Sequence, residues 1–168
     1  MLERLVFTFG TLYPDEIITA LLGTIPRNFY ATLSNYSIFK GGATQLPEKA
    51  RLFFESRNYD PQTFSYLFAK EDIEHDYTIS GRVYTVNIQQ ELILDHWELY
   101  PDWYRKQDVL VIDKENKSHE AFIYTLDYDG ERLSEFKRVL NDPEKVLKNA
   151  NATRQRVMDK FPKFFNHI

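Results

Sequence analysis

The 168-residue sequence predicts a single α+β domain that spans residues 1–168. Strand-like runs and helical patterns follow in the order strand, helix, several strands, helix, two strands, two helices, which is not the regular alternation of a parallel α/β fold. No linker, internal repeat or low-complexity segment divides the chain. Its hydrophobic share of 43% is ordinary for a globular domain and can supply one core.

The chain begins with a predicted strand that leads through a glycine-containing loop into a helix. Residues 5–9 form a short apolar and β-branched run, which predicts a buried strand. Pro14 and the two acids after it open a helix that Gly23 ends, because proline and acids suit the first turn and glycine the last. The loop 10–13 can offer N–H groups to a carboxylate or phosphate; alternatively, Gly10 only allows the turn.

The middle of the chain is the least regular part. Strands are expected at 29–39, 52–54 and 64–69, with a turn at 58–61 between the last two. The acid-rich stretch 71–76 lacks the glycine and closing glutamate of a calcium-binding loop, so we expect a solvated turn there.

The second half of the chain has clearer patterns. The strand 77–87 leads into a helix at 89–99, and strands at 109–112 and 121–126 are expected to form a hairpin. Helices are then expected at the ranges 130–140 and 143–160. The last helix has Asp142 in the N-cap position and an apolar face that should pack on the body. This face consists of Val146, Ala150, Val157 and Phe161.

Glu98 is the strongest candidate for chemistry. It lies at the end of the helix 89–99, one turn after Leu94, and Pro101 ends the helix because the residue before a proline avoids the α region. A carboxylate at the negative end of a helix and beside leucine tends toward a raised pKa, which a general acid/base near neutral pH needs. A solvated glutamate near a helix end is the more ordinary interpretation, and the residues alone leave both open.

Four short motifs occur in a distinctive order and spacing. They are Phe9-Gly10-Thr11-Leu12, Gly81-Arg82-Val83-Tyr84, Leu94-Asp95-His96-Trp97-Glu98 and Tyr104-Arg105. Together they resemble the signature of the gamma-glutamylcyclotransferase-like family, which includes gamma-glutamylamine cyclotransferases and plant avirulence-induced proteins. The resemblance implies a small mixed β-barrel-like sheet flanked by helices.

The resemblance also implies a reaction. In the family, the α-amine of a gamma-glutamyl compound attacks its own γ-carbonyl, which releases 5-oxoproline and an amine or amino acid, a step in glutathione metabolism. Glu98 would be the general acid/base, and Asp95 would position the helix. The substrate-binding residues implied are Phe9, Gly10, Thr11, Leu12, Tyr104 and Tyr124. No cofactor or metal is implied, because the attacking amine belongs to the substrate itself.

Two features depart from the family pattern. Phe9 stands where the first signature residue is usually tyrosine, so a hydroxyl is lost. The segment around 41–76 is longer than usual, and this insertion could cap a pocket or form an extra hairpin without a role in chemistry. Two alternatives therefore remain: a non-catalytic protein of the same fold that binds a small carboxylate, or an interaction module.

Composition limits the partners and the compartment. The net charge of −4 gives no basic surface for nucleic acid, and the absence of cysteine excludes disulfides and a thiolate nucleophile. No apolar run is long enough for a membrane span, and the charged Glu3 and Arg4 argue against a signal peptide. The four histidines have no metal-ligand spacing. We expect a cytoplasmic protein, monomeric or weakly dimeric, with a small-molecule partner only.

Overall fold

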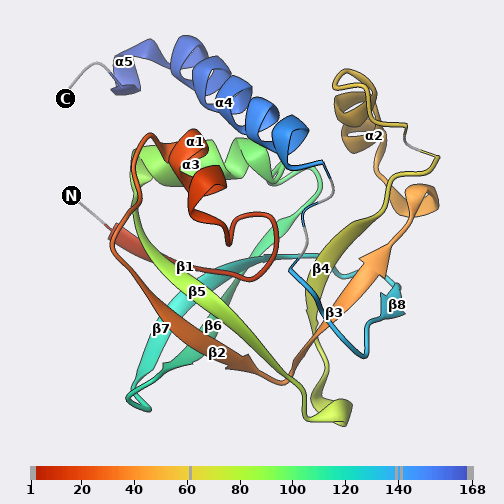
Figure 1. Ribbon diagram of the computed structural model, residues 1–168, viewed down its shortest axis with the longest axis vertical. Coiled ribbons are helices and arrows are strands. Elements are labelled where there is room, and N and C mark those ends of the chain that lie inside the picture. The colour runs from red at the N-terminus through yellow and green to blue at the C-terminus, as the bar shows by residue number, and fades with distance from the viewer. Residues whose placement is uncertain (1–2, 61, 139, 141, 166–168) are drawn as a thin grey trace.

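A strongly curved sheet dominates the computed structural model, which describes residues 3–60, 62–138, 140 and 142–165 (Figure 1). Its strands are β1 (Glu3–Thr8), β2 (Asn28–Ser34), β3 (Tyr36–Gly41), β4 (Tyr66–Glu71), β5 (Thr78–Asn87), β6 (Arg105–Asp113), β7 (Ser118–Thr125) and β8 (Glu131–Arg132). They are ordered β1-β5-β2-β6-β7-β4-β3-β8, and a further pairing of β1 with β7 closes the first five into a ring. The expected mixed, barrel-like sheet flanked by helices is confirmed.

Three helices cover one side of this ring. They are α1 (Asp15–Leu22), α3 (Ile88–Trp97) and α4 (Pro143–Lys160), and α4 lies across the other two (Figure 1). The short α5 (Pro162–Phe165) continues α4, whereas α2 (Glu48–Glu55) stands apart beside β3 and β4 (Figure 1). None of the described helices is long and apolar enough to cross a membrane.

Neighbouring residues of the ring strands face two different cores. Val6 of β1 belongs to the cluster beneath α1, α3 and α4, whereas Phe7 belongs to the cluster inside the ring. The same division separates Phe122 from Ile123 on β7, as expected for a strand whose side chains alternate between faces. Gly81 of β5 allows this packing, since a Cβ there would lie 2.4 Å from the Phe7 ring.

The C-terminal helix follows its predicted pattern. α4 has the expected bounds, and the side chain of Asp142 accepts a hydrogen bond from the backbone N–H of Lys145 at 3.1 Å. Val146, Ala150 and Val157 are buried, so the predicted packing face is confirmed.

Three predicted elements in the middle and late parts of the chain are wrong. The single strand at 29–39 is two strands, because Asn35 between them adopts a positive φ of 61° and turns the chain. The predicted strand 52–54 lies in α2, which Pro47 and Glu48 begin. The described part of 130–140 contains β8 rather than a helix, because this segment pairs with β3 instead.

The acid-rich stretch after β4 is more than a solvated turn. Asp72 accepts hydrogen bonds from Ser37 Oγ at 2.5 Å and from Arg132 Nε at 2.8 Å, and it contacts His75 Nδ1 at 2.6 Å. The hydrogen bond from Ser37 makes the largest contribution, and together these hydrogen bonds hold the pKa of Asp72 well below its usual range. Asp72 therefore joins β3, β4 and β8 through its side chain.

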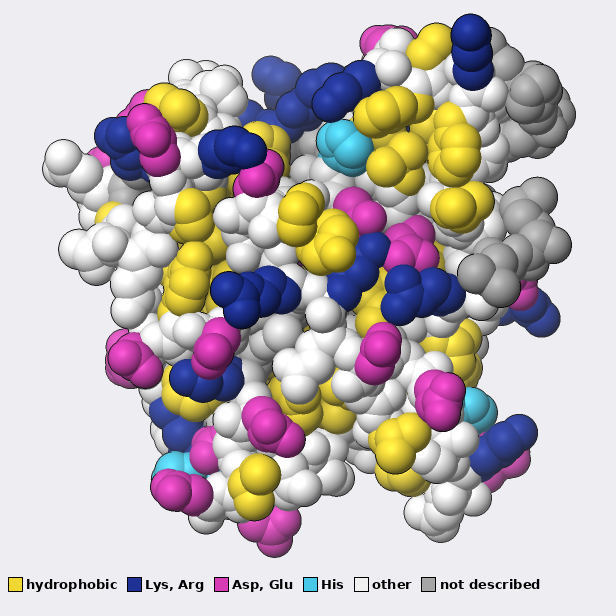
Figure 2. All heavy atoms as spheres, turned by 180° about the vertical axis from the view of Figure 1, so that it is seen from behind, with side chains coloured by type: hydrophobic (Ala, Val, Ile, Leu, Met, Phe, Trp, Pro, Cys, Tyr) yellow, Lys and Arg dark blue, Asp and Glu magenta, His cyan; other side chains and the backbone are white. Residues whose placement is uncertain are grey.

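The face drawn in Figure 2 carries side chains of both charges. On the face drawn in Figure 2, lysine and arginine side chains alternate with aspartate and glutamate. This mixture agrees with the small net charge of −4 and offers no extended basic surface for nucleic acid on that face.

Candidate active site

A cavity of about 630 Å³ opens between the β1–α1 loop, the end of α3 and the segment that follows α2. Its volume is typical of a small-molecule site. The residues predicted to be catalytic or substrate-binding all line it, namely Phe9, Gly10, Thr11, Leu12, Glu98, Tyr104 and Tyr124, whereas Asp95 does not. The sequence therefore identified residues that the fold brings together, although they come from four separate segments.

Local interactions fix the position of Glu98. At the start of α3, the Asn87 side chain accepts from the Gln90 N–H at 2.9 Å, and the Gln90 side chain accepts from the Asn87 N–H at 3.0 Å. At the other end, Leu99 has a φ of 53° and the chain leaves the helix there, two residues before Pro101. Glu98 is the residue that caps this end of α3, and its N–H bonds back to Leu94 O at 2.9 Å.

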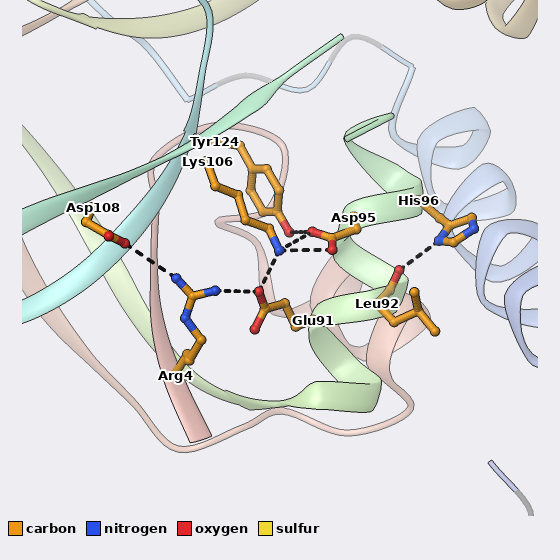
Figure 3. A network of polar contacts seen from close by, with 8 residues as sticks. All are labelled: Arg4, Glu91, Leu92, Asp95, His96, Lys106, Asp108 and Tyr124. Carbon is orange, nitrogen blue, oxygen red and sulfur yellow. Dashed lines mark hydrogen bonds and ion pairs between the residues drawn. The ribbon is translucent and has the colours of Figure 1, made fainter. Parts of the chain in front are cut away.

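Glu98 is one of three carboxylates on the same face of α3, and the other two form ion pairs. Figure 3 shows Lys106 Nζ between Glu91, at 2.5 Å, and Asp95, at 2.7 Å. Arg4 adds a second cation to Glu91 at 2.7 Å. Among the described residues, the carboxylate of Glu98 has no hydrogen bond or ion pair.

This isolation changes the acidity of Glu98. Burial, and then repulsion from Asp95, raise the pKa of Glu98 to about 8. The side chain keeps some accessible area because it faces the cavity. A carboxyl group with this pKa can hold a proton near neutral pH and can also release it, so it is suited to act as an acid and as a base.

The two tyrosines expected at the site use their hydroxyls within the protein. Tyr104 OH donates to Leu67 O at 2.8 Å. Tyr124 OH donates to Asp95 Oδ1 at 2.6 Å, as Figure 3 shows. Burial raises the pKa of both Tyr104 and Tyr124, so both stay neutral donors. Tyr124 therefore contacts the cavity with its ring and holds Asp95 with its hydroxyl.

The β1–α1 loop presents its backbone to the cavity. Tyr13 N–H closes a turn onto Gly10 O at 3.0 Å, while the N–H groups of Gly10, Thr11 and Leu12 have no partner among the described residues. A Cβ at Gly10 would meet nothing within 4 Å, so packing within the protein does not require glycine there. The open space beside the backbone is available to a ligand.

Phe9 packs by its ring. The ring meets that of Phe136 edge-on at 5.9 Å and belongs to the core inside the ring of strands. The backbone oxygen of Phe9 accepts a hydrogen bond from Arg138 Nε at 3.3 Å. Arg138 also lines the cavity. It could not be found from the sequence, because no motif includes it and its segment was expected to be a helix.

The described histidines have other partners than a metal. His75 contacts Asp72 and His119 contacts Asp113, while His96 Nδ1 lies 2.9 Å from Leu92 O (Figure 3). His167 lies outside the described residues. No group of three potential metal ligands occurs in the part of the chain that the structure describes.

Comparison with known families identifies the fold. The family described as gamma-glutamyl cyclotransferase, AIG2-like, matches residues 6–141. The chain belongs to this family. Its match includes every cavity residue predicted from the sequence and ends just before α4. No curated protein sequence matches the chain.

Solved structures share this cyclotransferase fold at low sequence identity. A gamma-glutamyl cyclotransferase is 13% identical with a TM-score of 0.61, and the alignment covers 96% of this chain and 86% of the other. An Arabidopsis thaliana protein is 16% identical with a TM-score of 0.57, covering 98% and 91%. A mouse AIG2-like protein is 17% identical with a TM-score of 0.54, covering 82% and 90%. Identities this low support the fold alone.

Proposed function

We propose that this member of the family is a cyclotransferase that converts a gamma-glutamyl compound into 5-oxoproline and a free amine or amino acid. The observation that carries the proposal is the unpaired Glu98, with its pKa of about 8, on the wall of the cavity that the free N–H groups of the β1–α1 loop also line. Glu98 can exchange a proton, and the N–H groups of the loop can bind a carboxylate.

In this mechanism the loop holds the substrate in the geometry of attack. The N–H groups of Gly10, Thr11 and Leu12 bind the α-carboxylate, and Arg138 beside Phe9 O adds positive charge at the same end. The α-amine and the γ-carbonyl belong to one molecule, so folding the substrate replaces a bimolecular encounter by ring closure.

Glu98 then moves two protons in turn. As a carboxylate it takes a proton from the α-ammonium group, and the neutral amine forms a C–N bond to the γ-carbonyl carbon. The protonated Glu98 gives that proton to the departing nitrogen as the original C–N bond breaks, and the regenerated carboxylate takes the second proton from the new ring nitrogen, so 5-oxoproline keeps one N–H. Glu98 passes this second proton to the released amine, which leaves as an ammonium group. The pKa of Glu98, about 8, lies between neutral pH and the pKa of an ammonium group, so these proton transfers are not strongly uphill.

Asp95 has a supporting role in this scheme. Its charge raises the pKa of Glu98, and Lys106 and Tyr124 keep that charge at a fixed distance from the cavity. Asp95 is therefore a positioning residue and not an acid/base group in the proposed reaction.

The test is a panel of gamma-glutamyl amino acids and gamma-glutamyl amines, with 5-oxoproline as the readout. Glu98→Gln keeps the shape of the side chain but cannot exchange the proton, so turnover should fall by about 10²–10⁴-fold. Glu120→Gln, on the exposed side of β7, is the matched control and should keep the parental rate.

Two results would count against the proposal. An unchanged rate in folded Glu98→Gln would remove Glu98 from the mechanism. An inactive parent that still binds 5-oxoproline would instead favour a binding protein of the same fold.

A further inference from the structure

The cavity has a second polar wall that the proposed reaction does not use. It is formed by α2, by the segment that follows it and by Trp103, whereas the β1–α1 loop contributes other residues to the lining. Much of this wall is aromatic, with Phe53, Phe54, Tyr59, Phe64, Tyr66 and Trp103. Three polar atoms in the wall are buried without a hydrogen-bond partner among the described residues: Arg57 Nη1, Tyr66 OH and Trp103 Nε1.

Arg57 is the most unusual of these groups. Its guanidinium carbon lies 3.5 Å from the centre of the Phe53 ring. Its only side-chain hydrogen bond to a described residue is a long one, 3.5 Å from Nη2 to Thr153 Oγ1. It has no ion pair within the described part of the chain. Burial and the nearby charge of Arg156 lower the pKa of Arg57 to about 10, so it is still a cation at neutral pH.

The nearby charged groups do not neutralise Arg57. Arg156 is a second cation, which donates to the same Thr153 hydroxyl at 3.3 Å. Asp60 also lines the cavity, but its carboxylate accepts from the Gln62 N–H at 2.9 Å and the Thr63 hydroxyl at 3.3 Å. Arg57 is only partly buried as a residue, but its Nη1 is buried without a partner and lies in a chain segment with another cation nearby, an arrangement that a bound anion would stabilise.

The other two unpartnered donors belong to the same wall. Trp103 and Tyr66 are each less than 10% exposed, and their rings lie 4.8 Å apart. The Trp103 ring also lies 4.6 Å from that of Tyr104, so this wall continues toward the tyrosine of the proposed reaction site. Buried donors without partners among apolar rings are the features expected of a wall that receives a ligand with few polar atoms.

We propose that this wall is a subsite for the leaving group, and that Arg57 selects a leaving group that carries a carboxylate on an apolar body. The inference rests on the proposed function, because cyclisation defines which part of the substrate departs. The preferred substrate class is then a gamma-glutamyl amino acid or peptide with an apolar side chain, in preference to a gamma-glutamyl compound of a neutral amine. Arg57 pairs with the carboxylate, and the aromatic rings cover the apolar body.

A matched pair of ligands tests this subsite. Gamma-glutamyl-phenylalanine and its C-terminal amide differ only in the charge that Arg57 would recognise. Calorimetric titration of Glu98→Gln, which does not turn the ligands over, should give an affinity about 10- to 100-fold higher for the acid. The same preference should appear in the kcat/KM of the parent, which requires no substitution.

Variants of two arginines test whether Arg57 causes the preference for the acid over the amide. In a Glu98→Gln background, Arg57→Gln should reduce the ratio of the two affinities to nearly one, and Arg57→Lys should keep part of it. Arg51→Gln is the control, because Arg51 is exposed on α2 and pairs with Glu55. A role of Arg57 in packing on Phe53 alone would change thermal stability without changing this ratio.

The possible results separate the inference from the proposed function. Equal affinities for acid and amide, a preference that survives Arg57→Gln, or no binding of the acid would overturn the subsite. A preference that depends on Arg57, in a parent that releases no 5-oxoproline, would support the subsite and refute the reaction. Gamma-glutamyl-phenylalanylglycine, whose carboxylate lies one residue further away, tells an amino-acid leaving group from a peptide one.

Discussion

Replacing Glu98 by glutamine should stabilise the protein at neutral and alkaline pH while it removes turnover. The pKa of Glu98 rises from its ordinary value of 4.5 to about 8 in the folded protein. Between these two values the folded state holds a proton that the unfolded state has released. The free energy of unfolding therefore falls as the pH rises from about 4.5 to about 8 and is then constant.

The size of the pKa shift of Glu98 determines how much the free energy of unfolding changes. At about 1.4 kcal/mol per pKa unit, the full shift corresponds to about 5 kcal/mol above pH 8. At pH 7 Glu98 is still mostly protonated in the folded state, and the cavity leaves it some access to water. We therefore expect Glu98→Gln to gain about 1–3 kcal/mol at pH 7, which for a chain of this length is a rise in Tm of several degrees.

Urea unfolding of the parent and of Glu98→Gln from pH 4 to pH 9 measures this difference. The two proteins should be nearly equal in stability at pH 4, diverge up to pH 8 and stay parallel above it. Glu120→Gln should show no such divergence, because Glu120 is exposed. A constant gap at every pH, or a less stable Glu98→Gln at pH 8, would refute the assignment of a raised pKa to Glu98.

The remaining predictions concern the surroundings of Glu98 and two glycines. Since the charge of Asp95 raises the pKa of Glu98, Asp95→Asn should move the rising limb of the kcat/KM profile to lower pH. Lys106→Met should move it to higher pH, because a compensating cation is lost. Gly10→Ala should leave the Tm nearly unchanged, since its Cβ meets nothing in the protein. It should raise KM, because the Cβ would occupy space that is open to the substrate. Gly81→Ala should cost about 1–3 kcal/mol in urea unfolding, because its Cβ would overlap Phe7.

Elements with strong local signals could be predicted from the sequence. Proline and acids begin α1 at Asp15, and Gly23 ends it with a φ of 77°. The hairpin of β6 and β7 and the helix α4 have equally local causes in their turn residues and apolar faces. These elements depend on neighbours in the chain, which a sequence displays directly.

Elements that depend on distant contacts could not be predicted. The apolar run at 52–54 fits a strand or a helix, and only its surroundings decide. Likewise, β8 exists because Leu133 N–H bonds to Ile38 O and residues of β8 pair with Phe39 and Lys40, nearly a hundred positions earlier. A helical pattern in the segment around β8 was outweighed by this pairing.

The candidate site likewise contains residues that the sequence reveals and properties that depend on distant contacts. Glu98 and the loop of Gly10 could be found because they form short motifs with a known order. The sequence indicated a raised pKa for Glu98 from its place at a helix end, but the causes found in the fold are burial and the charge of Asp95, which the sequence does not display. Arg57 belongs to no motif, and its lack of a partner becomes visible only when the cavity is complete.

The register of one hairpin explains why Glu98 alone is left unpaired. Lys106 of β6 lies directly opposite Tyr124 of β7, so both side chains leave the sheet on the same face and both reach Asp95. Glu91, one turn before Asp95, shares the same lysine. A register shifted by one residue would turn one partner of this pair toward the interior of the ring and would leave Asp95 short of a partner. The pairing that fixes α3 on the sheet thus also decides which of its carboxylates stays free to exchange a proton.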